Sequence, residues 1–246
     1  MESDLRTTGP FFRAGLRRRW RERSETSPAA RRFFQSFQST KRGPVASRGD
    51  VLDEAAFEAA HQSVASQLPP INGLVNCAGI AQVPVPIEDW PVDARSRIMG
   101  SHRWGTSIAC RIVGSAIAGD GAAVNLSSVV GVHTGPALAC GPIKAAVILT
   151  QILAVQWARR GVRVNAVAPA WTDTPFLQPK ERQGERDLTP IINAPPMGRL
   201  LKPQNPAEVV CFLLSPAASD VTAATVHCDG GVLAEYGWFP FGGLPQ

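Results

Sequence analysis

The sequence has no cysteine pairing pattern and no long apolar run. Its five cysteines are scattered, odd in number and without the spacing of paired metal ligands, so we expect reduced thiols and no metal site. The most apolar stretch, residues 145–157, is shorter than the roughly 20 residues that a membrane span requires and contains Thr150, Gln151 and Gln156. No secretory signal is recognisable near residue 1. These absences favour a cytoplasmic protein that does not span a membrane.

Positive charge is concentrated at the start of the chain. Of the 246 residues, 1–48 contain 12 Lys and Arg against 4 Asp and Glu, whereas 49–246 contain 13 against 16. The basic segment has neither strand alternation nor a sustained helical stripe. We therefore expect a poorly ordered arm over residues 1–48 and a folded domain over 49–246. No nucleic-acid recognition module surrounds the arm, so we expect no nucleic-acid partner.

From residue 50 onward, short apolar segments alternate with long helical patterns. The segments predicted to be strands are 71–75, 122–127, 162–168 and 224–231, and the segments predicted to be helices are 50–68, 94–117, 142–160 and 206–215. Strands separated by long helices predict a parallel sheet covered on both faces. The predicted fold class is therefore a doubly wound α/β sheet, with ligands at the carboxyl ends of its strands.

Polar side chains gather at the end of the second predicted strand and at the start of the helix that follows. The strand ends in Ser127 and Ser128, and Lys144 lies one turn after Cys140 on the helix. Side chains four residues apart share a helix face, so these two are expected to face the same pocket.

These motifs resemble those of the short-chain dehydrogenase/reductase family. VNCAGI at 75–80, NLSSVVG at 125–131, CGPIKAA at 140–146, VRVNAVAPAWTDT at 162–174, PMGRL at 196–200 and CDGG at 228–231 occur in the family's order. The resemblance covers residues 49–246. It implies a Rossmann-like domain, NAD(P)-dependent interconversion of a small alcohol and its carbonyl, and a homo-oligomer.

The resemblance also implies roles for four catalytic positions. Ser128 matches the family's serine, with Ser127 as an alternative, and Lys144 matches its lysine. Cys140 stands at the position of the catalytic tyrosine, and His102 at that of the supporting asparagine. Two of the four positions are therefore changed.

The cofactor implied by the resemblance is NAD or NADP. Asp50 and Val51 match the pair that lies against the adenine ring, and Lys144 matches the residue that holds the nicotinamide ribose. The other predicted cofactor contacts are Asn76, Ala78, Gly79, Pro169 and Thr174.

The start of the chain departs from the family's pattern. The family begins with a strand, a GxxxGxG turn and a helix whose amides hold the pyrophosphate. Here Gly9 and Gly15 match two of the glycines and Arg13 replaces the third, while MESDLR is no apolar strand. We predict that the first strand and its glycine-rich turn are absent or distorted. A reading-frame change near codon 48 is one hypothesis, and it is excluded if neither alternative frame encodes a strand–GxxxGxG–helix pattern.

Three interpretations of function follow. The first is an NAD(P)-dependent oxidoreductase with impaired activity, because the proton donor is altered. The second is a non-catalytic relative that acts as a dimerising or regulatory subunit through the helices at 94–117 and 144–160. The third is an adaptor that uses the basic arm.

Overall fold

A computed structural model describes residues 50–80, 86–117, 119–133, 140–174, 177 and 189–235, with the side chains of 140–145 left out. These residues belong to one compact unit, Arg48–Gln246. The predicted arm, including Gly9, Arg13 and Gly15, lies outside the described residues.

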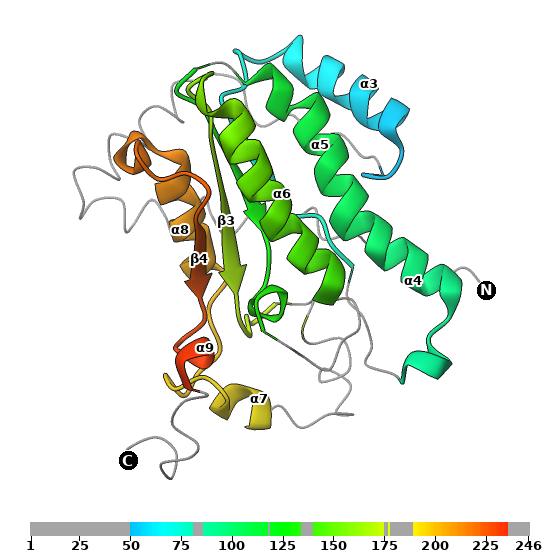
Figure 1. Cartoon of the computed structure of the whole chain (residues 1–246), viewed down its shortest axis with the longest axis vertical. Helices are drawn as coiled ribbons and strands as arrows, with labels where there is room; N and C mark the ends of the chain where they lie inside the picture. Colours follow the sequence, from blue (N-terminus) through cyan, green and yellow to red (C-terminus); the bar gives the residue numbers. More distant parts are fainter. Residues whose placement is uncertain are drawn as a thin grey trace. The chain divides into compact units, whose positions relative to one another are not determined.

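Within the described residues, four parallel strands form one sheet in the order β1-β2-β3-β4, which confirms the predicted α/β class. Strands β3 and β4 are labelled in Figure 1. The strands are β1 (Gly73–Asn76), β2 (Ala122–Leu126), β3 (Arg163–Pro169) and β4 (Thr225–Cys228). Asn76 pairs with Asn125, and Ala166 with Thr225. All four carboxyl ends therefore lie at the same edge of the sheet.

Helices precede, connect and follow the strands (Figure 1). They are α3 (Glu54–Ala65), α4 (Val92–Met99), α5 (Thr106–Ile112), α6 (Cys140–Ala158), α7 (Thr189–Asn193), α8 (Gln204–Leu214) and α9 (Val232–Glu235). The 3₁₀ turns are η1 (Ile87–Asp89), η3 (Gly114–Ala116), η4 (Val129–Gly131) and η6 (Pro216–Ala218), and η2 (Gly100–Gly105) is a π-helix. In this part of the chain, no helix is both long and apolar enough to cross a membrane.

Local sequence accounts for several helix ends. The Asp53 carboxylate accepts a hydrogen bond from the Ala56 amide at 2.9 Å and so caps α3. After α6, the chain turns at Gly161, whose φ of +73° suits a residue without a side chain, as predicted. The continuous helix predicted over 94–117 is instead divided into α4, η2, α5 and η3.

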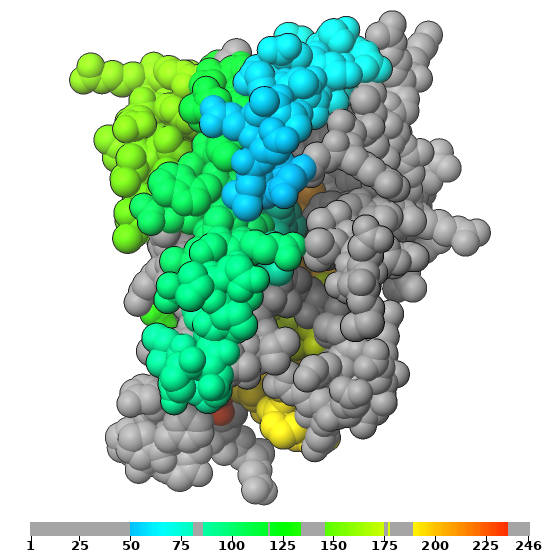
Figure 2. All heavy atoms as spheres, turned by 90° about the vertical axis from the view of Figure 1, so that its right-hand side faces the viewer, coloured from blue at the N-terminus to red at the C-terminus, as the bar shows by residue number. Residues whose placement is uncertain are grey.

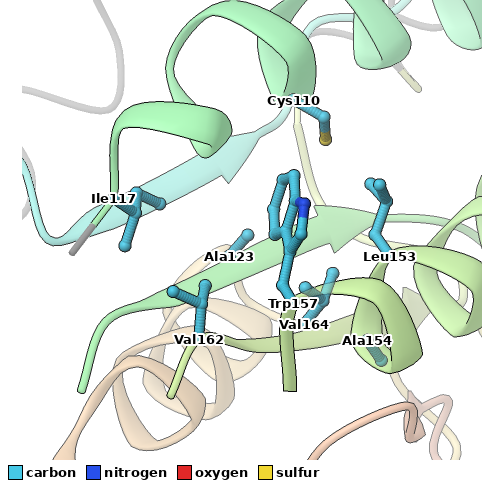
Figure 3. Close-up of a cluster of buried hydrophobic side chains, with 8 residues drawn as sticks. All are labelled: Cys110, Ile117, Ala123, Leu153, Ala154, Trp157, Val162 and Val164. Atoms are coloured by element: carbon cyan, nitrogen blue, oxygen red, sulfur yellow. The ribbon is translucent and has the colours of Figure 1, made fainter. Parts of the chain in front are cut away.

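The sheet separates two apolar clusters because successive side chains of a strand point to opposite faces. On one face, Ala123 and Val164 pack with Leu153, Ala154 and Trp157 of α6, as Figure 3 shows. On the other face, Val124 and Val167 pack with Val210 and Leu213 of α8. Strands β2 and β3 are thus buried on both sides, as their apolar sequences predicted.

Two arginines join helices to their neighbours. Arg163, at the start of β3, is buried and donates hydrogen bonds to the carbonyls of Leu213 and Ser215, at 2.6 and 3.1 Å. Its positive charge thus lies at the C-terminal end of α8, where the helix dipole favours it. Arg111 of α5 forms an exposed ion pair with Glu54 of α3. Helix α3, coloured blue to cyan, lies on the face of the molecule shown in Figure 2.

Replacing Gly114 by alanine should destabilise the domain. The new Cβ would lie 2.9 Å from Cζ3 of the buried Trp157 ring, and such overpacking costs about 1–3 kcal/mol. We expect the melting temperature to fall by about 2–4 °C for each kcal/mol lost, as measured by circular dichroism. Gly73→Ala is the matched control, because its Cβ would meet Leu214 at an ordinary 3.6 Å. Equal melting temperatures for the two variants would contradict this account.

Candidate functional site

The segments that follow the four strands meet at the carboxyl edge of the sheet. They are residues 77–80 after β1, 127–128 after β2, 170–174 after β3 and 229–231 after β4. This is the edge at which ligands bind to open α/β sheets. Six of the eleven predicted site residues lie in or beside these segments: Asn76, Ala78, Gly79, Ser128, Pro169 and Thr174.

Ser128 is held loosely at the end of β2. Its hydroxyl accepts a hydrogen bond from the Val130 amide at 3.4 Å and so begins η4, and it donates to the Pro169 carbonyl at 3.5 Å. The structure thus brings together Ser128 and Pro169, two of the predicted site residues. Both bonds are long, so the half-buried hydroxyl can turn toward a substrate oxygen at little cost. Ser127 is the alternative candidate for the catalytic serine. Its backbone amide donates a hydrogen bond to the Val167 carbonyl at 2.8 Å.

The segment after β3 is tied to two neighbouring segments. The Ala170 amide donates to the Cys228 carbonyl at the end of β4, at 2.9 Å. Thr172 forms an isolated parallel bridge with Leu201, just before α8. Thr174 is half-buried, and its hydroxyl donates to the Thr172 carbonyl at 3.3 Å. Residues 169–174 are therefore fixed along the same edge as Ser128.

The turn after β1 is exposed at Cys77 and Ala78 and packed at Gly79. A Cβ on Gly79 would lie 2.6 Å from Cε1 of His102. The turn is therefore accessible at Cys77 and Ala78, and the imidazole of His102 packs against it at Gly79. Asn76, just before the turn, points its amide into the interior, where it donates to Asn125 at 2.8 Å.

His102, predicted to stand at the position of the supporting asparagine, binds the turn after β1. Its Nε2 lies 3.0 Å from the Ile80 carbonyl; since a carbonyl only accepts, Nε2 carries the proton and neutral Nδ1 has a lone pair. Burial lowers the pKa of His102, and the hydrogen bond to Ile80 opposes this in part. The ring is therefore a neutral structural link near neutral pH.

The π-helix η2 joins two predicted cofactor segments. His102 in η2 contacts the turn after β1, and Val51 packs on Gly105 so closely that a Cβ there would lie 2.7 Å from Val51 Cγ2. The Asp50 carboxylate is exposed and accepts from the Leu52 amide at 2.9 Å. We did not predict η2. Gly100 and Gly105, at its two ends, lie against Leu52 and Val51, and such tertiary contacts cannot be derived from spacing in the sequence.

Helix α6 begins at Cys140, two residues before the predicted start, and includes Lys144. The side chains of Cys140 and Lys144 lie outside the described residues, so their shared pocket stays a prediction. Among the residues that the structure describes, no group of His, Cys, Asp and Glu side chains could hold a metal ion.

The sequence is similar to those of known dehydrogenases. Residues 23–233 match the family model described as enoyl-(acyl carrier protein) reductase. Galactitol 2-dehydrogenase of Rhizobium johnstonii is 38% identical over 189 residues, which cover 74% of this chain and 73% of that protein. The inactive 2-(S)-hydroxypropyl-CoM dehydrogenase 2 of Xanthobacter autotrophicus is 35% identical over 197 residues, 75% of this chain and 83% of that protein.

Solved structures agree with these matches. Levodione reductase superposes with a TM-score of 0.74 at 26% identity, covering 85% of this chain and 86% of that one. ElxO with NADP bound gives a TM-score of 0.73 at 25% identity, with 83% and 84% covered. The chain belongs to the short-chain dehydrogenase/reductase family, whose general activity is that of an oxidoreductase.

The residues that the structure describes at the carboxyl edge of the sheet fit a nicotinamide cofactor. Ala78 is exposed, so the turn after β1 is accessible to a bound group, and Ser128 and Thr174 lie in the segments that follow the neighbouring strands β2 and β3. The residues matched to the pyrophosphate turn, Gly9, Arg13 and Gly15, fall outside the described part of the chain.

Burial of His102 should make stability depend on pH. Because its folded pKa lies below the unfolded value of about 6.5, the unfolded state binds more protons as the pH falls below about 6.5. The contribution of His102 to the free energy of unfolding is therefore fully present above that pH, and it is lost as the pH falls toward the lowered folded pKa. We expect urea unfolding between pH 7.5 and 5.5 to show a smaller loss in His102→Asn than in the wild type.

The matched control is His227→Asn, because His227 is exposed on β4. This variant should lose as much stability as the wild type over the same pH range. If His102→Asn did so too, burial of His102 would not be the cause.

Proposed function

We propose that this chain is an NAD- or NADP-dependent oxidoreductase domain for a small alcohol or carbonyl, with impaired turnover. The observation that carries the proposal is the convergence of the turn after β1, Ser128 and residues 169–174 at one edge of the sheet. Helix α6, which includes Cys140 and Lys144, borders the same region and packs on β2 and β3. The similarity to galactitol 2-dehydrogenase and to NADP-bound ElxO supports both the reaction class and the cofactor.

Each residue has a distinct task in this proposal. The nicotinamide, when bound, supplies or accepts the hydride at the substrate carbon. The Ser128 hydroxyl orients the substrate oxygen, and Lys144 holds the ribose and lowers the pKa of the proton donor. Asp50 and Val51 contact the adenine, while Asn76, Ala78, Gly79, Pro169 and Thr174 line the cofactor.

The impairment follows from the length of the Cys140 side chain. Reduction of a carbonyl leaves an alkoxide that requires a proton, and a thiol with a pKa of about 8.5 is acidic enough to give one. Its sulfur, however, is bonded directly to the β-carbon, whereas a tyrosine oxygen stands beyond a whole ring. The thiol therefore falls short of the substrate oxygen. Loss of a positioned acid costs about 10²- to 10⁴-fold in rate.

Restoring a phenol at position 140 should raise turnover. We expect Cys140→Tyr to increase the rate of NADH or NADPH oxidation with a panel of small carbonyl substrates by up to about 10²- to 10⁴-fold, measured by absorbance at 340 nm. Cys140→Phe is the matched control, since it adds the same ring without the hydroxyl. Equal rates for the two variants would mean that position 140 does not supply the proton.

Cofactor binding can be tested before activity. Titration of the full chain with NADH and with NADPH, followed by nicotinamide fluorescence, should show saturable binding of one or both. If neither binds, the oxidoreductase proposal fails and the non-catalytic interpretation replaces it. The similarity to the inactive Xanthobacter protein is consistent with such an outcome.

The exposed face of α6 favours a second candidate, a subunit that forms a homo-oligomer. Ile148, Ile152 and Val155 recur at helical spacing and are 57%, 48% and 76% exposed. Trp104 of η2, which packs near α6, is 56% exposed. Large apolar side chains gathered on one face mark an interaction surface. A second copy of the chain, packed through α5 and α6, would cover them.

A charge on this face should prevent the association. We expect Ile152→Glu to elute as a monomer when the wild type elutes as a dimer or tetramer, measured by size-exclusion chromatography with light scattering. Val92→Glu is the control, because Val92 is an exposed residue in the first turn of α4, where the helix dipole tolerates glutamate. A monomeric wild type, or an Ile152→Glu variant that remains associated, would exclude this interface.

The adaptor interpretation and the division of the chain at residue 48 remain proposals. A DNA affinity that falls steeply with salt and disappears when residues 1–48 are removed would support the adaptor. The proposed cytoplasmic location would be tested by fractionating cells that express the full chain.

A further inference from the structure

Three polar side chains form a buried chain of hydrogen bonds behind the candidate site. The Asn76 amide donates to Asn125 Oδ1 at 2.8 Å, the Asn125 amide donates to Thr150 Oγ1 at 2.8 Å, and the Thr150 hydroxyl donates to the Ala146 carbonyl at 2.8 Å. We call Asn76, Asn125 and Thr150 the amide–hydroxyl chain. It runs from β1 through β2 to α6, so it links three of the elements that bear predicted site residues.

The amide–hydroxyl chain is neutral; Asn76 is half-buried, and Asn125 and Thr150 are closed to water. Asn125 and Thr150 are both 0% exposed. The Cys110 thiol of α5 adjoins the chain, with its sulfur 3.2 Å from the Asn76 amide nitrogen. Burial raises the pKa of Cys110 to about 11, so this group stays a thiol. Water cannot replace a lost bond here without room being made for it, and breaking one therefore leaves a buried polar atom unsatisfied.

Thr150 is also the one polar residue among the buried side chains of the described part of α6. The others are Ala146, Leu153, Ala154 and Trp157. Apolar packing is not directional, so small side chains such as Ala146 and Ala154 define the axial position of the helix weakly. The bond to Asn125 is directional and is lost if α6 slides along the sheet. It is thus suited to fix that position.

Both ends of this bond lie close in sequence to the candidate site. Asn125 of β2 precedes Ser128, which lies just after that strand, by three residues, and Thr150 follows Lys144 by six residues on α6. Asn76 immediately precedes the turn that contains Ala78 and Gly79. A shift at Thr150 would therefore move the segment with Cys140 and Lys144 relative to both Ser128 and the turn.

From this arrangement we infer that Asn125 and Thr150 are positioning residues, which set the axial position of α6 against β2 and so place Lys144 and Cys140 opposite Ser128. The inference rests on the proposed function, because it assigns these residues to the cofactor site. It extends that function because it makes two buried residues, Asn125 and Thr150, determine how α6 is aligned with Ser128, although neither residue contacts the substrate.

The test compares Thr150→Val with Thr150→Ser. Valine keeps the shape of threonine and removes the hydroxyl, whereas serine keeps the hydroxyl and removes a methyl group. We expect Thr150→Val to raise the Kd for NADH or NADPH about tenfold or more and Thr150→Ser to stay within about threefold of the wild type. Ser96→Ala is the matched control, because the exposed Ser96 hydroxyl bonds only to its own helix, at the Val92 carbonyl.

A second readout separates alignment from cofactor binding. The rate at which iodoacetamide alkylates Cys140, relative to Cys211 of α8 in the same molecule, reports the surroundings of position 140 by mass spectrometry. Thr150→Val should change this ratio about threefold or more, and Thr150→Ser should not. If the wild type binds no nucleotide, the proposed oxidoreductase function fails, and the alkylation ratio alone decides the positioning role.

The inference is overturned if Thr150→Val lowers the melting temperature while leaving both the Kd and the alkylation ratio at their wild-type values. Such a result would make the amide–hydroxyl chain a contribution to stability only. If Thr150→Val does not fold, Thr150→Ala replaces it, because the smaller side chain leaves room for a water beside Asn125. That water would satisfy Asn125 without holding α6, so the alkylation ratio should still change.

Discussion

Polar side chains at the centre of a sheet covered on both faces must find their hydrogen-bond partners inside the protein. Asn125 and Asn165 are both 0% exposed, on the adjacent strands β2 and β3. Asn165 donates to the Val221 carbonyl at 2.7 Å and accepts from the Ala224 amide at 3.0 Å, which fixes the segment leading into β4. Asn125 bonds to β1 and α6 instead. These two amides therefore tie together all four strands and the helix that borders the candidate site.

The strands were predictable because their burial on both faces leaves a near-continuous apolar sequence. The predicted strand at 162–168 lies one residue from β3, and the chain turns at Gly161 after α6, which ends at Ala158, two residues before its predicted end. The π-helix η2 could not be predicted from the apolar pattern, since one additional residue in a helical turn hardly changes the spacing of apolar residues. It depends on tertiary contacts, above all Val51 and Leu52 packed against Gly105 and Gly100.

The candidate site was predictable where a residue's place follows from the end of a strand. Ser128 and Pro169 end neighbouring strands, and the structure places them within 3.5 Å of each other. The contact of His102 with Gly79 and Ile80 could not be derived from spacing, because it depends on how η2 packs over the turn. Arg163 was missed for a related reason: its partners on α8 lie 50 or more residues away along the chain.

The two positions proposed as altered catalytic positions, 102 and 140, differ in the chemistry of the substitution. An asparagine amide and a neutral imidazole both offer an N–H to a carbonyl, so His102 can hold the turn at Ile80 in the way that an amide would. A thiol and a phenol both offer a proton, but they offer it at different distances from the backbone. Under the proposed assignment, the histidine thus offers an N–H as an asparagine would, whereas the thiol offers its proton closer to the backbone than a phenol. A domain that has accepted both would keep the shape of its cofactor edge more readily than its chemistry, as the proposed impairment of turnover requires.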